Sequence, residues 1–179
     1  HDPQKCAKYY CDKHVVKIPV EICQILSQIY HELGTKKPPY KRCKGISFNL
    51  NTYLWAKESV ENYKYCTDLA MELLNEYKHR YNKTSHKSEK ALKWLQDNVP
   101  PIKLKKRTKF KLSKNIEIYN EFYPDVVKAS RLIYVDFKCK NDRWSKREKP
   151  KWFDPLKKKN QADKLKLKNK IMYMVRNEL

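Results

Sequence analysis

Five polar side chains near the start of the chain recur at the spacing of one helix face. If residues 12–33 form a helix, that face carries His14, Lys17, Glu21, Gln24 and Gln28. A carboxylate among cations stays ionised and can accept a proton, so we take Glu21 as a candidate catalytic base. His14 is a candidate to orient a sugar or phosphate, or to shuttle a proton. A surface ion pair between Glu21 and Lys17, and a structural role for His14, are the simpler alternatives.

The elements that position this row are predicted to be helices. Beside the polar face runs an apolar face made of Val15, Ile18, Ile22, Leu26, Ile29 and Leu33. Pro19 removes one amide donor, so this helix should kink or restart there, and Gly34 should end it. Further helices are predicted over about 3–11, 52–81, 88–96 and 124–138.

The scarcity of glycine narrows the fold class. Only Gly34 and Gly45 occur, which disfavours an all-β fold with many tight turns and excludes glycine-rich nucleotide loops. We predict an all-α protein, with a compact single-domain helical bundle over residues 1–153 that carries basic loops. A Lys-rich C-terminal extension, predicted as a helix, follows over residues 154–179.

The charge of the chain points to a polyanionic partner. The formal net charge is +21, and residues 103–179 hold 24 Lys and Arg against 9 Asp and Glu. Residues 1–102 hold 17 against 11. Such a surplus repels itself unless a polyanion screens it, so we expect a nucleic-acid partner, double-stranded DNA. An anionic membrane surface and a purely solvated surface are the alternatives.

Two basic stretches are the predicted contact regions. Residues 103–114 hold seven basic residues in twelve and predict a surface loop or a two-strand excursion. This stretch should either contact phosphates or be a merely solvated surface. Residues 143–153 interleave two Trp and one Phe with five basic residues, which suits base stacking beside phosphates or aromatic docking on the core. With two cations of the first long helix, the predicted nucleic-acid-binding residues are Lys13, Lys17, Lys105, Lys106, Arg107, Lys109, Arg143, Arg147, Lys151, Trp152 and Phe153.

Cysteine usage and hydropathy limit the remaining possibilities. Six scattered cysteines suit reduced thiols and an intracellular protein better than a disulfide framework. Cys6, Cys11 and His14 lack a second ligand pair, so neither a metal nor a cofactor is predicted. No run of 18 apolar residues exists, so no transmembrane segment is expected. The chain begins at His1 without Met, from which we expect a trimmed or incomplete N-terminus.

Several of these residues resemble a known family. The pattern Asp12-x-His14-x6-Glu21 is similar to the N-terminal helix of phage-type pyrimidine-dimer DNA glycosylases, the endonuclease V family of T-even phages. The Lys-Pro-Lys-Trp-Phe stretch at 149–153 looks like that family's basic ending.

A closer resemblance, over roughly residues 1–153, is to uncharacterised proteins of large DNA viruses and phages. It is carried by Cys-Asp-Lys-His-Val-Val-Lys at 11–17, Trp55, Asn62-Tyr63 and Glu76-Tyr77-x-His79-Arg80-Tyr81, with a late Pro-x-Trp.

The glycosylase resemblance implies an all-helical enzyme that kinks damaged duplex and flips out a base. In that family the N-terminal amine attacks C1′ and forms a Schiff base. Glu21 would assist this step and the β-elimination that follows, and His14 matches the family's helix histidine near the substrate. The chain departs from the family where Val20 and Gln24 stand in place of arginines, and the N-terminal nucleophile is not identifiable in it.

These observations favour a DNA-binding protein that resembles a pyrimidine-dimer DNA N-glycosylase and AP lyase of base excision repair. The alternative is a non-catalytic nucleic-acid-binding or viral structural protein, packaged in a virion, on the same helical scaffold. The Lys-rich extension motivates this alternative, because a protein partner could dock on its spaced apolar residues, Leu167, Ile171, Met174 and Val175.

Overall fold

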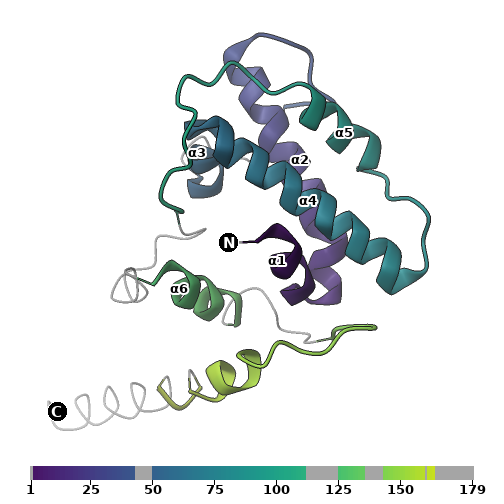
Figure 1. Cartoon of the computed structure of the whole chain (residues 1–179), viewed down its shortest axis with the longest axis vertical. Helices are drawn as coiled ribbons and strands as arrows, with labels where there is room; N and C mark the ends of the chain where they lie inside the picture. The colour runs from purple at the N-terminus through teal and green to yellow at the C-terminus, as the bar shows by residue number, and fades with distance from the viewer. Residues whose placement is uncertain (1, 43–49, 112–124, 136–142, 160, 164–179) are drawn as a thin grey trace, which may run out of the picture. The chain divides into compact units, whose positions relative to one another are not determined.

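The computed structural model describes residues 2–42, 50–111, 125–135, 143–159 and 161–163. Within these ranges every regular element is a helix, which confirms the predicted all-α class (Figure 1). None of the described helices combines the length and the apolar content required to span a membrane. Most of the predicted C-terminal extension, including the apolar residues proposed to dock on a partner, lies outside the described residues.

The chain divides into two compact units. Unit 1 comprises His1–Lys114 and Asn141–Glu148, and unit 2 comprises Asn115–Lys140 and Lys149–Leu179. Each unit is therefore built from segments that are separated in the sequence. The boundary predicted after residue 153 stays a prediction.

Unit 1 begins with the short helix α1 (Pro3–Tyr9). Asp2 precedes it as the N-cap, and its carboxylate accepts a hydrogen bond from the Lys5 amide at 3.1 Å. Pro3 then occupies the first turn, where its missing amide proton costs little. α1 ends earlier than the predicted residue 11.

The second helix, α2 (Asp12–Leu33), carries the polar row identified in the sequence. It is continuous through Pro19, which is buried, so the restart predicted there is wrong. Burial of the apolar face stabilises the helix enough to tolerate the one amide that proline lacks. Gly34 ends α2 as predicted: its φ of 63° is left-handed, and its amide donates to the Tyr30 carbonyl at 2.9 Å.

The single helix predicted over 52–81 is wrong, because two helices occupy this stretch. α3 (Asn51–Glu58) and α4 (Val60–Tyr81) are separated by Ser59, whose backbone is extended, at φ −146° and ψ 158°. The Ser59 hydroxyl accepts a hydrogen bond from the Asn62 amide at 3.1 Å and so caps α4. A side-chain cap of this kind starts a new helix where a continuous apolar pattern suggested only one.

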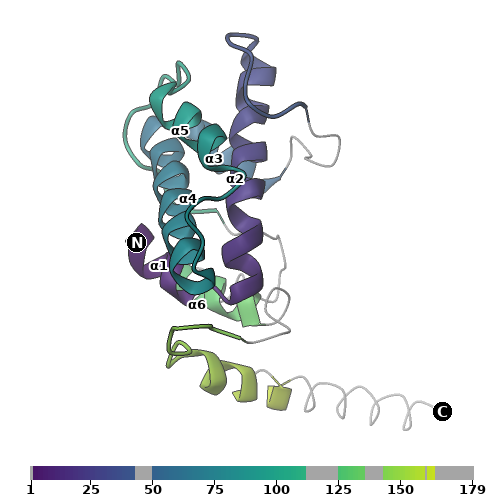
Figure 2. The ribbon, with the colours of Figure 1, turned by 90° about the vertical axis from the view of Figure 1, so that its right-hand side faces the viewer.

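α5 (Glu89–Asp97) completes the core of unit 1. Figures 1 and 2 show α2 and α4 side by side, with α1 packed near one end of the pair and α5 near the other. The largest cluster of buried apolar residues lies among α2, α3, α4 and α5, and it includes Leu26, Tyr30, Tyr53, Tyr63, Leu74 and Leu92. This frame fixes both ends of α4, and the candidate sites lie at those ends.

Unit 2 contains α6 (Val126–Ile133) and helical residues at 153–159 and 161–163. Asp125 caps α6 by accepting a hydrogen bond from the Lys128 amide at 3.0 Å. The predicted helix over 124–138 is thus present from residue 126. Its predicted last residues, 136–138, lie outside the described residues.

Candidate functional site

The structure gives the two predicted catalytic residues different surroundings. His14 is 6% exposed, and its Nδ1 lies 3.1 Å from the buried Cys11 thiol. The side chain of Glu21 is 37% exposed, and its Oε1 lies 2.7 Å from the Lys17 ammonium. Both arrangements match the simpler alternatives, a buried histidine and a surface ion pair. The carboxylate of Glu21 nevertheless remains accessible to solvent.

The charge of Glu21 also affects the phenol of Tyr10, the partly buried residue that follows α1. The pKa of Tyr10 is raised by burial above all, then by the neighbouring thiols of Cys6 and Cys66, and further by the charge of Glu21. Tyr10 therefore stays neutral in the folded protein, and its ring packs edge-on against His14 with centroids 6.2 Å apart.

At the start of α2, the structure assembles a buried carboxylate site that the sequence analysis did not assign. Asp12, the first residue of α2, accepts hydrogen bonds from the Ser145 amide at 2.9 Å and the Ser145 hydroxyl at 2.7 Å. The Arg80 Nη1 donates to the same carboxylate at 3.2 Å. Burial opposes ionisation, but these hydrogen bonds outweigh it and lower the pKa of Asp12. Asp12 is therefore an anion that already has its partners.

Arg80, near the end of α4, is the hub of this site. Its side chain is 0% exposed, and its Nε donates to the Glu76 carboxylate at 3.0 Å. The other guanidinium nitrogens reach the carbonyls of Tyr10 at 2.8 Å and Lys8 at 3.2 Å. One arginine thus joins α4 to the end of α1 and the start of α2.

The ion pairs continue from Glu76 to Arg147, one of the predicted nucleic-acid-binding residues. Arg147 Nη2 and Nε donate to the two Glu76 oxygens at 2.8 and 3.0 Å, a bidentate arrangement. Burial opposes ionisation of Glu76, but hydrogen bonds from Arg147 and Arg80 lower its pKa. The carboxylate in turn raises the pKa of Arg147. The Arg147 side chain is 32% exposed, so it forms the solvent edge of this group. We call Asp12, Glu76, Arg80 and Arg147 the buried network.

The residues around Arg143 complete this end of unit 1. The Arg143 carbonyl accepts a hydrogen bond from the Asp12 amide at 2.9 Å, and the Trp144 indole donates to the Tyr9 carbonyl at 3.1 Å. The Arg143 side chain itself is 85% exposed and approaches the Asp12 carboxylate only to 3.8 Å. Of the predicted contact residues here, Arg147 is engaged internally, whereas Arg143 faces solvent.

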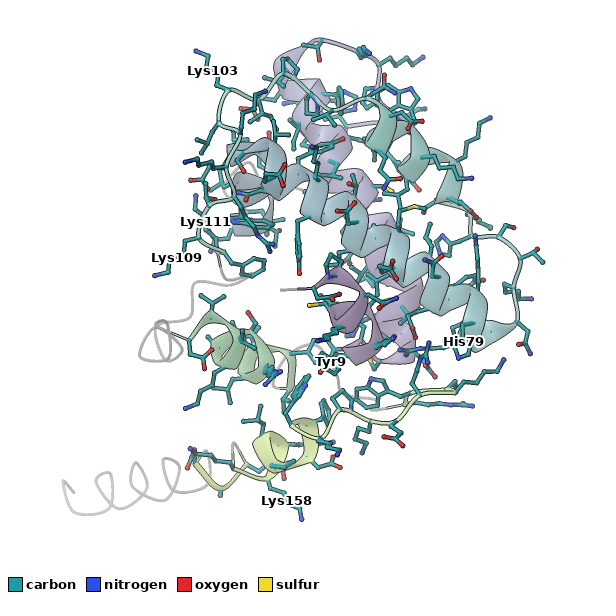
Figure 3. The ribbon with its side chains drawn as sticks, viewed as in Figure 1. Tyr9, His79, Lys103, Lys109, Lys111 and Lys158 are labelled. Atoms are coloured by element: carbon teal, nitrogen blue, oxygen red, sulfur yellow. The ribbon has the colours of Figure 1, made fainter. Side chains whose placement is uncertain are left out.

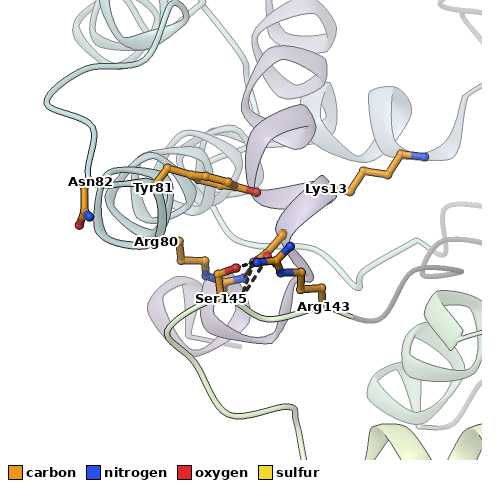
Figure 4. Close-up of a pocket in the computed structure, with 7 residues that line it drawn as sticks. Lys13, Arg80, Tyr81, Asn82, Arg143 and Ser145 are labelled. Atoms are coloured by element: carbon orange, nitrogen blue, oxygen red, sulfur yellow. Dashed lines mark hydrogen bonds and ion pairs between the residues drawn. The ribbon is translucent and has the colours of Figure 1, made fainter.

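A cavity of about 590 Å³ opens beside the buried network. It is lined by residues from the start of α2, the end of α4 and the segment after residue 142: Asp12, Lys13, Arg80, Tyr81, Asn82, Arg143 and Ser145. Figure 4 shows Tyr81 extending from α4 toward the start of α2, with Arg143 and Ser145 together below it. We call this cavity the Asp12 pocket.

The predicted basic loop lies at the other end of α4. We call residues 103–111 the basic segment. Its Leu104 and Lys105 carbonyls accept hydrogen bonds from the Val60 and Glu61 amides, at 2.9 and 3.3 Å. These are the first two amides of α4, which no turn of the helix can satisfy. The basic segment thus closes the start of α4.

Hydrogen bonds from the Asn62 side chain also hold the basic segment. The Asn62 side-chain oxygen accepts a hydrogen bond from the Thr108 amide at 3.1 Å, and its amide group donates to the Thr108 hydroxyl at 2.7 Å. The same amide donates to the Trp55 carbonyl at 2.8 Å, and Asn62 is 0% exposed. A buried asparagine with these partners fixes the backbone of the segment.

Aromatic rings support Arg107 in the middle of the segment. Its guanidinium carbon lies 4.2 Å from the Tyr65 ring centroid and 5.9 Å from that of Trp55. Phe110 packs edge-on against Trp55, with centroids 4.9 Å apart. This cation–π stack holds a planar guanidinium at the surface.

Most lysines of the segment are exposed to solvent. Lys105 donates to the Ile102 carbonyl at 3.3 Å, and Lys111 lies 3.1 Å from the Glu58 carboxylate. Lys103, Lys105, Lys106 and Lys109 are exposed, and Figure 3 shows Lys103 and Lys109 extending outward on the same side of the ribbon. The backbone is therefore fixed while these side chains lie at the surface.

In unit 2, the predicted aromatic contact residues pack against their own unit. Phe153 is 0% exposed, and the Trp152 ring lies 5.0 Å from the Arg131 guanidinium carbon and 6.4 Å from the Tyr134 ring. This placement corresponds to the docking alternative for Phe153. Lys151 remains exposed.

Metal and disulfide chemistry find no support among the described residues. They contain no group of three or more His, Cys, Asp or Glu side chains placed to hold a metal ion. Cys6, Cys11, Cys23 and Cys66 are not joined in disulfides. Burial raises the pKa of Cys23 to about 12, so this thiol is inert at neutral pH.

Comparison with known proteins finds no matching family model, no matching curated protein and no matching solved structure. The functional argument therefore depends on the residues themselves.

Proposed function

We propose that this protein binds double-stranded DNA and that the basic segment is its main contact surface. The observation that carries the proposal is a backbone fixed by α4 and Asn62 beneath several exposed lysines and a stacked Arg107. A surface that is ordered before binding loses little conformational entropy when it meets phosphates. The formal charge of +21 supplies the long-range attraction.

A charge-matched pair of variants tests this proposal. The first is K103Q/K106Q/K109Q, and the control is K83Q/K87Q/K90Q, which removes three exposed lysines after the other end of α4. Titration of labelled duplex at several salt concentrations should give weaker binding for the first variant only. For this variant, the slope of log K against log salt concentration should become less negative by about 3, because each lost phosphate contact contributes about 0.9 to the slope.

Equal losses for the two variants would show that net charge, and not this surface, drives binding. A salt-independent affinity of the unmodified protein would remove the electrostatic basis altogether. An RNA duplex of the same sequence forms the third arm, because the contacts proposed here are to phosphates. Tighter binding of RNA than of DNA would overturn the assignment of DNA as the partner.

A second candidate function is strand cleavage at abasic sites by an N-glycosylase with AP-lyase activity. The observation that favours it is the Lys17–Glu21 pair, an amine and an accessible carboxylate 2.7 Å apart on α2. An amine condenses with the C1′ aldehyde of an abasic sugar, and water leaves as the imine forms. A carboxylate can then remove a C2′ proton, which breaks the C3′–oxygen bond and releases the phosphate. His14, which is buried, would act only through its neighbours.

Borohydride trapping on duplex with one abasic site tests the second candidate. A covalent adduct would establish an imine, and mass mapping would assign the amine to Lys17 or to the N-terminal amino group. Glu21→Gln should abolish nicking while leaving duplex binding nearly unchanged. Absence of an adduct, with salt-sensitive binding retained, would instead favour the non-catalytic binding protein or virion component.

A further inference from the structure

The Asp12 pocket has the composition of an anion site. Of its charged lining residues, Lys13, Arg80 and Arg143 are cations and Asp12 alone is an anion. Asp12 already accepts from Ser145 and Arg80, so its charge is compensated within the wall. The excess positive charge therefore belongs to the two exposed cations, Lys13 and Arg143.

The pocket is also built before any ligand arrives. Two members of the buried network, Asp12 and Arg80, line it, and the Arg80 side chain is 0% exposed and bonded to two carboxylates and two backbone carbonyls. The Ser145 amide and hydroxyl connect the segment after residue 142, which also lines the pocket, to the Asp12 carboxylate. The Asp12 amide donates to the Arg143 carbonyl, so the backbone that carries the Arg143 side chain is held by the same fixed residues.

Arg143 is the side chain best placed to meet a ligand. It is 85% exposed, and its nearest contact with Asp12 is 3.8 Å, longer than a hydrogen bond. A guanidinium presents a planar fork that matches two oxygens of a phosphate. Lys13, in the first turn of α2, also lines the pocket. In Figure 4 its side chain extends away from Arg143, so its flexible four-carbon stem has to turn before its ammonium group can reach the same phosphate.

The volume of the pocket and the Tyr81 ring indicate which chemical group accompanies the phosphate in the ligand. A volume of about 590 Å³ falls within the range of about 300–1,000 Å³ typical of small-molecule sites. Tyr81 is 37% exposed and its ring forms one side of the pocket. An aromatic face beside a phosphate-binding fork suits a base and sugar attached to that phosphate.

We propose that the Asp12 pocket binds the phosphate monoester of a nucleotide, with Arg143 and Lys13 on the phosphate and Tyr81 beside the nucleoside. The nucleotide is either free or the phosphorylated end of a nucleic-acid strand. The pocket lies at the opposite end of α4 from the basic segment, so this inference does not depend on the function proposed above.

Calorimetric titration of the full chain with deoxyadenosine 5′-monophosphate, with deoxyadenosine as the matched ligand control, tests the proposal. The monophosphate should bind saturably and the nucleoside should not. R143Q/K13Q should weaken monophosphate binding at least tenfold, since two charge-assisted contacts are removed. K87Q/K90Q, which removes the same charge outside the pocket, should bind normally. Because all four side chains are exposed, both variants should keep the thermal midpoint of the unmodified protein.

Equal affinity for nucleoside and monophosphate, or normal binding by R143Q/K13Q, would overturn the proposal. The two sources are separated by an oligonucleotide with and without a 5′-phosphate. If the phosphate strengthens binding in the unmodified protein and not in R143Q/K13Q, the strand end is the ligand. If R143Q/K13Q weakens binding of the free monophosphate but not of the 5′-phosphorylated oligonucleotide, the ligand is the free nucleotide. K103Q/K106Q/K109Q should still bind the monophosphate, so loss of duplex binding and loss of this site are distinguishable.

Discussion

The two ends of α4 use the same kinds of side chain in opposite ways. At the end of the helix, Arg80 and Arg147 lie against Glu76 and Asp12, and the charges of these largely buried side chains compensate one another. At the start, Arg107 lies on aromatic rings and the neighbouring lysines face water. A positive charge in the sequence therefore does not by itself identify a binding surface. A guanidinium held between buried carboxylates cannot meet an external phosphate, whereas one that lies at the surface can.

The first way to break this comparison is to remove the hub of the buried network. Arg80→Ala should lower the free energy of unfolding by about 3–5 kcal/mol, because Asp12 and Glu76 would remain buried without their shared cation. Urea unfolding followed by circular dichroism measures this loss. Arg80→Lys should recover only part of it, since an ammonium cannot reach both carboxylates and the two carbonyls at once. A loss below about 1 kcal/mol for Arg80→Ala would mean that the network contributes little.

Acid should weaken the same network, with a smaller loss of stability, by protonating its carboxylates. The pKa values of Asp12 and Glu76 are lowered in the folded protein, so their stabilisation is complete above their unfolded values, near 4. It is lost as pH falls through the lower folded values. The free energy of unfolding should therefore decrease as pH falls below about 5, and Glu76→Gln should flatten that decrease. Parallel pH profiles for Glu76→Gln and the unmodified protein would contradict this assignment.

The physical difference between the two ends also explains what the sequence could predict. Local signals predicted the helices, and Asp2 and Gly34 act as the expected caps. Ser59 was missed because its effect depends on the side-chain bond to the Asn62 amide, which an apolar pattern does not report. The exposed basic segment was predicted from composition alone, since burial of many lysine charges is unfavourable and such a stretch stays in contact with water.

The buried network was not predicted as a unit, because its members are far apart in the chain. Asp12, Glu76 and Arg147 lie in three separate segments, and only the fold brings them together. A signal was present in the sequence, since Glu76 and Arg80 are four residues apart on one helix. Arg147 was assigned to nucleic acid because a single sequence shows the charge of a residue and not its partner.

At the exposed end, the Asn62 hydrogen bonds that hold the basic segment can be broken without changing any charge. Asn62→Ala should lower the free energy of unfolding by about 1–3 kcal/mol, because Thr108 and the Trp55 carbonyl lose buried partners. Duplex affinity should fall severalfold although every lysine remains, since the segment must then be ordered on binding. Asn75→Ala, an exposed change on the same helix, is the control. Unchanged affinity for Asn62→Ala would show that charge acts without a fixed backbone.

The smallest expected effect separates the shape of Arg107 from its charge. Arg107→Lys keeps the positive charge but replaces the planar group that lies on Tyr65. We expect the free energy of unfolding to fall by about 0.5–1 kcal/mol, the usual contribution of an exposed cation–π contact. Duplex affinity should fall about twofold to fivefold, with an unchanged salt dependence, because one phosphate contact remains but its two-point geometry is lost. Arg107→Gln should weaken binding further and flatten the salt dependence by about 1, since the contact itself is removed. If Arg107→Lys binds duplex as the unmodified protein does, the stacked guanidinium acts only as a charge, and the exposed end of α4 is distinguished from the buried end by solvation alone.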